Sequence, residues 1–123
     1  MEPVVLAFHI PGGVQPRLRQ LCAEKNITLR LIGREQYGVA LGSLVAGSAV
    51  TGGNGEEFTE PMLVMALFPK GMMSDFLDSF PGRLIPSISL KAVLTPTNAA
   101  WTAERLYREL GTERESFRKY AKK

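Results

Sequence analysis

The sequence predicts an α/β (α+β) fold: a ferredoxin-like βαβ(α)βαβ sheet with helices on one face and an extra C-terminal helix. Residues 3–10 and 62–68 form apolar runs, which are typical of strands buried on both faces. Residues 27–32 and 90–94 are strand-like but carry polar positions, which indicates edge strands. In a ferredoxin-like sheet the first and third strands are central, so this burial pattern fits that order. The alternative is a doubly wound parallel sheet, because the expected strands alternate with helices.

Apolar residues recur at helical spacing between these runs, as at Val14, Leu18 and Leu21. Pro16 suits the first turn of a helix, where an N–H group has no partner within the helix. The second helix would be an insertion between the second and third strands. Gly111 in the last helix is expected to mark a kink or an early end. The four helices expected on this spacing cover residues 14–26, 34–46, 72–80 and 98–123.

The length and composition predict one domain over residues 1–123, with a glycine-rich flexible loop at about residues 47–60. With 45% apolar and 22% charged residues, the chain resembles an ordinary globular protein and not a disordered one. The apolar runs are too short to cross a bilayer, which takes about 20 residues, and the first residues lack the basic region of a signal peptide. The single cysteine, Cys22, excludes an internal disulfide and suits a reducing compartment. We therefore expect a cytoplasmic protein with no membrane contact.

The net charge of +3 is concentrated in the last part of the chain. Residues 98–123 hold 7 Lys/Arg against 4 Asp/Glu, whereas the rest is balanced. A basic segment can bind nucleic acid, but basic residues also favour the C-terminal end of a helix because they oppose its dipole. We favour the helix-dipole interpretation, so a nucleic-acid partner is the less favoured alternative. The possible basic patch consists of Arg114, Arg118, Lys119, Lys122 and Lys123.

Sequence motifs for catalysis, metal binding or cofactor binding are absent. The loop at residues 11–13 contains two glycines but lacks the lysine of a phosphate-binding loop and the spacing of a dinucleotide-binding one. Cys22 falls on an apolar helical face, where it is expected to pack as a small hydrophobe. His9 has no catalytic or metal-ligating partner near it in the sequence. We expect no catalytic residue, no metal and no cofactor, and the sequence favours a protein that is not an enzyme.

Thr95, Pro96, Thr97 and Asn98 form the most distinctive polar cluster. Pro96 favours an extended Thr95, and Asn98 or Thr97 can cap the final helix. A ligand site is the other interpretation, because hydroxyl, amide and free N–H groups would meet at the carboxyl end of a strand. The residues of that site would be Thr95, Thr97, Asn98 and His9.

The motif around this turn carries a resemblance. Lys91, Pro96 and Trp101 are the structural landmarks of the run KAVLTPTNAAW, which leads into the last helix. Residues 61–115 resemble a small bacterial domain family of unknown function that has a K-A-V-x-T-P-T-N-x-x-W signature. The resemblance implies a cytoplasmic bacterial protein and attaches no reaction to it.

The favoured hypothesis is a non-enzymatic interaction or regulatory module that self-associates, as a homodimer, through an exposed face or edge of its sheet. Binding of another protein is the other form of this hypothesis. A small-molecule or anion-binding domain that uses the Thr95–Asn98 turn is the alternative. Nucleic-acid binding through the basic C-terminal helix is the third hypothesis.

Overall fold

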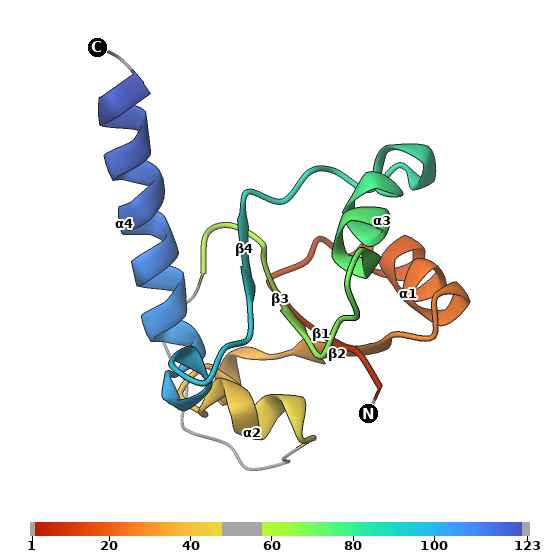
Figure 1. Cartoon of the computed structure of the whole chain (residues 1–123), viewed down its shortest axis with the longest axis horizontal. Helices are drawn as coiled ribbons and strands as arrows, with labels where there is room; N and C mark the ends of the chain where they lie inside the picture. The colour runs from red at the N-terminus through yellow and green to blue at the C-terminus, as the bar shows by residue number, and fades with distance from the viewer. Residues whose placement is uncertain (1, 48–57, 122–123) are drawn as a thin grey trace.

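The computed structural model describes residues 2–47 and 58–121, and for residues 114–121 it describes the helical backbone only. Most of the loop expected at about residues 47–60 lies outside these ranges. The sheet has four strands in the order β2-β1-β3-β4 (Figure 1). The strands are β1 (Val4–Phe8), β2 (Thr28–Ile32), β3 (Met62–Ala66) and β4 (Leu90–Val93).

The predicted α/β class is confirmed, and so is the placement of the two apolar runs at the centre of the sheet. All five residues of β1 and all five of β3 are buried. β1 pairs with β2 in parallel and β3 pairs with β4 in parallel, whereas β1 and β3 are antiparallel. The sheet is therefore mixed, and the doubly wound parallel alternative is wrong. The two strands of each parallel pair are consecutive along the chain and are connected by a helix.

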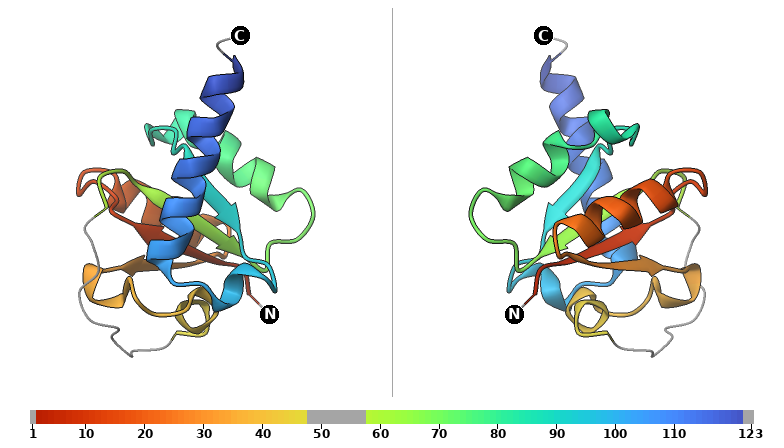
Figure 2. Two further views of the ribbon diagram at one scale, coloured as in Figure 1. Left: turned by 90° about the vertical axis from the view of Figure 1, so that its left-hand side faces the viewer. Right: turned by 90° about the vertical axis from the view of Figure 1, so that its right-hand side faces the viewer.

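The helices cover both faces of the sheet (Figure 2). Helices α1 (Gln15–Glu24) and α3 (Met72–Asp78) pack on the odd-numbered residues of β1, whereas α2 (Leu41–Val45) and α4 (Ala103–Ala121) pack on the even-numbered ones. The expected helices on one face correspond to α1 and α3, and the extra C-terminal helix corresponds to α4. Successive strand residues point to opposite faces, so each face has its own apolar core.

The two β-α-β units are related by an approximate two-fold axis normal to the sheet. Leu6 pairs with Val64 at the middle of the central strands, 58 positions further along the chain. The same offset relates His9 and Leu67, which follow β1 and β3 and both have a left-handed backbone, with φ of 57° and 62°. It also relates Pro11 to Pro69. The first and second halves of the chain thus repeat one architecture.

The segment at residues 34–46 differs from the single helix that its spacing predicts. It forms a 3-10 turn, η1 (Arg34–Gln36), and the short helix α2. Ala40 between them is extended, with φ −60° and ψ 139°, and forms an antiparallel bridge with Thr102. This long-range pairing interrupts the helix, because a residue in a bridge cannot also be helical.

The last helix begins later than its spacing predicts. Residues Asn98–Ala100 form the 3-10 turn η3, and α4 starts at Ala103. The Thr102 hydroxyl accepts a hydrogen bond from the Arg105 N–H at 3.2 Å, so Thr102, and not Asn98 or Thr97, caps α4. The helix does not end early at Gly111, as one of the two expectations had it, because α4 is helical through this position.

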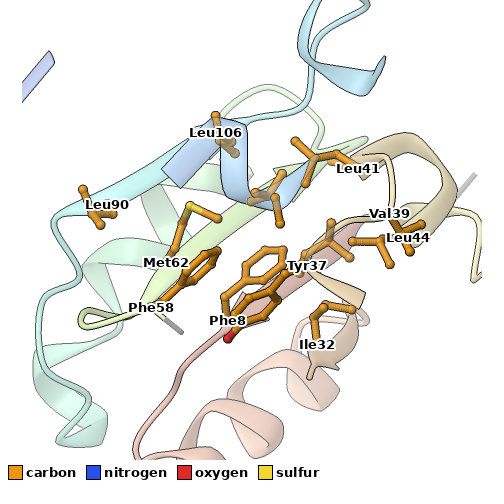
Figure 3. Packing of buried hydrophobic residues seen from close by; sticks show 14 of the residues in the cluster. Phe8, Ile32, Tyr37, Val39, Leu41, Leu44, Phe58, Met62, Leu90 and Leu106 are labelled. Carbon is orange, nitrogen blue, oxygen red and sulfur yellow. The ribbon is translucent and has the colours of Figure 1, made fainter. Parts of the chain in front are cut away.

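An aromatic stack joins distant segments on the α2 and α4 face (Figure 3). The Phe58 ring lies 4.1 Å from the Tyr37 ring and 4.0 Å from the Tyr107 ring, measured between centroids, and both pairs are stacked. Phe8 of β1 contacts Tyr37 and Phe58 at 5.9 Å each. The Tyr107 hydroxyl accepts hydrogen bonds from the N–H groups of Thr59 and Glu60 at 3.0 and 3.2 Å. The stack thereby attaches α4 to the start of β3.

Cys22 packs in the core between α1 and the sheet, as expected, with 1% of its surface exposed. Burial raises the pKa of its thiol from the ordinary 9.0 to about 12. Between these two pKa values only the unfolded thiol ionises. The stability of the folded chain that depends on an un-ionised Cys22 is therefore complete below the ordinary pKa. It is lost as the pH rises towards the folded pKa, because ionisation of the unfolded thiol lowers the free energy of unfolding.

We expect Cys22 to be unreactive in the folded protein, because the thiolate is the nucleophile and burial both suppresses it and blocks access. A thiol-reactive chromogenic reagent at about pH 8 should label the chain only after denaturant is added. Rapid, complete labelling under native conditions would show that α1 opens readily.

Candidate functional site

The Thr95–Asn98 turn is held by three hydrogen bonds of Asn98. The Asn98 side chain is buried, with 9% exposure. Its Oδ1 accepts the Thr95 N–H at 2.8 Å, and its Nδ2 donates to the Val93 carbonyl at 3.0 Å. The Asn98 N–H in turn donates to the Thr95 Oγ1 at 3.1 Å. Both ends of the amide are therefore bonded within the chain.

The position of these bonds gives the Asn98 amide a specific architectural role. The Leu94 N–H bonds to the Met65 carbonyl, so even-numbered residues of β4 direct their backbone groups to β3. The Val93 carbonyl and the Thr95 N–H consequently point away from the sheet. These are two groups that a further strand would bond, and the Asn98 amide bonds both of them. Asn98 thus closes the carboxyl end of the β4 edge.

The other landmarks of the motif also have structural partners. The Lys91 Nζ donates to the Ile88 carbonyl at 3.0 Å. Trp101 is half-buried against the core of the α2 and α4 face, and the Arg105 guanidinium lies 4.2 Å above its ring. The Trp101 carbonyl accepts the Leu41 N–H at 2.9 Å, which joins η3 to α2. Pro96 and Thr97 are exposed.

The structure separates His9 from the Thr95–Asn98 turn. His9 follows β1, whose last residue, Phe8, pairs with Met62 at the start of β3. Met62 pairs with Leu90 at the start of β4, whereas the turn follows the end of β4. His9 and the turn are therefore at opposite ends of the sheet, roughly 15 Å apart along the strands. One site cannot contain both in this arrangement.

Two surface hollows lie away from both His9 and the Thr95–Asn98 turn. One of ≈ 480 Å³ follows α1 and is lined by Gln15, Arg19 and their neighbours, and one of ≈ 120 Å³ lies between α3 and β4. Among the side chains of residues 2–47 and 58–113, no group of three or more His, Cys, Asp or Glu could hold a metal ion. The described helices include none that is long and apolar enough to cross a membrane. The predicted basic patch lies outside the described side chains: Arg114, Arg118, Lys119, Lys122 and Lys123.

The β2 edge differs from the β4 edge in being open. The Thr28 N–H bonds to the Pro3 carbonyl at 2.9 Å, so even-numbered residues of β2 face β1. The backbone groups of Leu29 and Leu31 therefore point outward, and in the described part of the chain no side chain or loop bonds them. Both leucine side chains are only half-buried. This edge could accept another strand.

Arg30, at the centre of β2, is a functional candidate that the sequence did not indicate. Its Nε atom is buried and has no hydrogen-bond partner among the described residues. The guanidinium packs over Gly47, where an added Cβ would lie 3.1 Å from Nη2. A half-buried cation without a carboxylate is costly, so it favours an acidic partner from outside the described chain. The alternating pattern of residues 27–32 indicated an edge strand but could not show this missing partner.

Comparison with known proteins gives a match over the second half of the chain. The chain matches no curated protein and no solved structure. One family does match, and the match begins directly before β3 and ends within α4, so it spans the second β-α-β unit. A family of unknown function over this part was expected from the sequence, and that expectation is confirmed. Residues 61–117 match the family model described as Domain of unknown function (DUF3783).

Proposed function

We propose that this protein is a non-enzymatic cytoplasmic interaction module that self-associates through the β2 edge of its sheet. The observation that carries the proposal is the contrast between the two edges. On β4 the Asn98 amide bonds two outward groups at the end of the strand, the Val93 carbonyl and the Thr95 N–H. On β2 the outward groups of Leu29 and Leu31 have no such partner in the part of the chain that the structure describes.

Edge strands normally carry devices against pairing, so the unbonded backbone groups of β2, at the opposite edge of the sheet from the closed end of β4, support a pairing function. The side chains agree with this role. Leu29 and Leu31 pack against the core below α1 and leave part of their surface to solvent. A strand added to β2 would cover this apolar surface and bond the outward backbone groups at the same time.

The mass in solution tests the proposal. We expect light scattering coupled to gel filtration to give the mass of a dimer of the 13.5 kDa chain, with dissociation on dilution. A strict monomer up to about 1 mM would contradict self-association, because even a weak complex forms at that concentration.

Proline substitution locates the interface on β2. Leu31→Pro removes an outward N–H and no bond to β1, so the fold should persist while the dimer is lost. The matched control is Val93→Pro, which removes the equivalent outward N–H of β4 and should leave the dimer intact. Circular dichroism would confirm that both variants fold. A dimer that survives Leu31→Pro but not Val93→Pro would assign the interface to β4.

A further inference from the structure

We infer that two copies of the chain pair through antiparallel β2 strands whose two-fold axis passes at Leu29. The inference rests on the proposed function and adds the register and the residues that recognise the second copy. The two sheets would form one continuous sheet of eight strands, in the order β4-β3-β1-β2 followed by β2-β1-β3-β4 of the second copy. An antiparallel pair about a two-fold axis uses the same surface twice, which closes the assembly as a dimer.

The face of β2 below α1 is self-complementary in this register. Leu29 would lie opposite Leu29 of the second copy, and Leu31 would lie opposite Ile27. These cross-strand pairs are apolar at every position, and the exposed part of each leucine would be covered. Cross-strand apolar pairs are a main source of stability in a sheet.

The opposite face supplies the charge complementarity. Thr28 and Arg30 share this face, and the register places Arg30 opposite Thr28 of the second copy. The Thr28 hydroxyl lies 3.4 Å from the Oε2 atom of Glu2, whose side chain is exposed. The unpaired guanidinium of Arg30 would therefore meet the Glu2 carboxylate of the second copy. Because of the two-fold symmetry, this ion pair would occur twice in the dimer.

Other registers lack this match. An axis at Arg30 places the two guanidinium groups opposite each other, which is unfavourable. An axis at Leu31 places Leu29 opposite Gly33, which has no side chain to cover it. Of these three registers, only the one with its axis at Leu29 places apolar residues opposite each other on one face and opposite charges near each other on the other face.

Charge reversal tests the register in the full-length chain. Arg30→Glu and Glu2→Arg each replace both attractive pairs by like charges, so each should raise the dimer dissociation constant about tenfold or more. The double reversal restores opposite charges and should restore most of the affinity. Glu2→Arg is the variant that keeps the test valid if Arg30→Glu perturbs folding, because Glu2 is exposed. Lys70→Glu, an exposed reversal in the loop before α3, is the control and should leave the dimer unchanged.

The results separate the two levels of the proposal. If the wild-type chain dimerises and neither single reversal weakens the dimer, the register is wrong and self-association stands. If the wild-type chain is a monomer, both fail. Weakening by each single reversal without recovery in the double variant would also overturn the Arg30–Glu2 pairing.

A cysteine at the axis gives an independent readout. In this register the two residues 29 would be about 5.5 Å apart between Cα atoms, within the range of a disulfide. Leu29→Cys should form a covalent dimer on mild oxidation, whereas Leu31→Cys should not, because its two copies would be about 13 Å apart along the strands. The buried Cys22 should not interfere. Equal crosslinking of the two variants would contradict the register.

Discussion

Phe58→Ala is expected to lower the free energy of unfolding by about 3–5 kcal/mol, the usual range for truncation of a buried aromatic residue. Phe58 is 2% exposed and stacks between Tyr37 and Tyr107. Its removal would leave a cavity at the point where the 3-10 turn η1, helix α4 and the start of β3 meet. The loss should be at the upper end of the range, because two stacked rings cannot both move into the space.

Urea denaturation followed by far-UV circular dichroism would measure this loss. The control is Phe68→Ala, which truncates a partly buried phenylalanine on the other face of the sheet. Phe68 makes one described edge-on contact, with Phe76 at 5.8 Å, so its truncation should cost clearly less. Equal losses in the two variants would show that the Phe58 stack contributes no more than ordinary burial.

The strands could be predicted from the sequence because their signal is local. The apolar runs around β1 and β3 and the polar positions in β2 and β4 identify central and edge strands without knowledge of the fold. The segment at residues 34–46 could not be predicted in this way. Its helical spacing is correct for α2, but the bridge between Ala40 and Thr102 joins residues far apart in the sequence. Local periodicity contains no information on such a bridge.

The internal repeat was also hidden from the sequence. The two units share Pro11 with Pro69 and Gly13 with Gly71, but the positions after β1 and β3 hold His9 and Leu67. What these two residues share is a left-handed backbone, which is uncommon in residues other than glycine. The repeat is therefore conserved in geometry and topology, and a comparison of residue types shows only its turns.

The turn after β4 was identified from the sequence, but its geometry was not. Asparagine is a common helix cap, so Asn98 was expected to bond the last helix. The structure instead directs its amide to the Val93 carbonyl at the end of β4 and to the Thr95 N–H just after it. Which backbone groups of an edge strand point outward depends on its register with β3, and that register cannot be read from the strand itself. The unpaired Arg30 escaped prediction for the same reason.

Asn98→Ala is the second large effect that we expect, with a loss of about 1–3 kcal/mol in the free energy of unfolding. The variant leaves the Thr95 N–H and the Val93 carbonyl without partners in the chain. It also opens the β4 edge, so we expect concentration-dependent association beyond the dimer. Thermal unfolding and light scattering would measure the two effects. Thr97→Ala is the matched control in the same turn and should be nearly neutral, because Thr97 is exposed and makes no side-chain capping bond.

The same variant decides between architecture and a ligand site at this turn. If Asn98 closes the edge, Asn98→Ala loses stability in the absence of any added molecule. Asn98→Asp should lose part of it, because the carboxylate still accepts the Thr95 N–H but cannot donate to the Val93 carbonyl. A ligand site predicts a different result: a small acid or nucleotide would raise the melting temperature of the wild-type chain, and Asn98→Ala would abolish that shift while unfolding at the wild-type temperature. With both ends of the amide bonded within the chain, we expect the first result, because a ligand would have to displace two hydrogen bonds that already satisfy the edge.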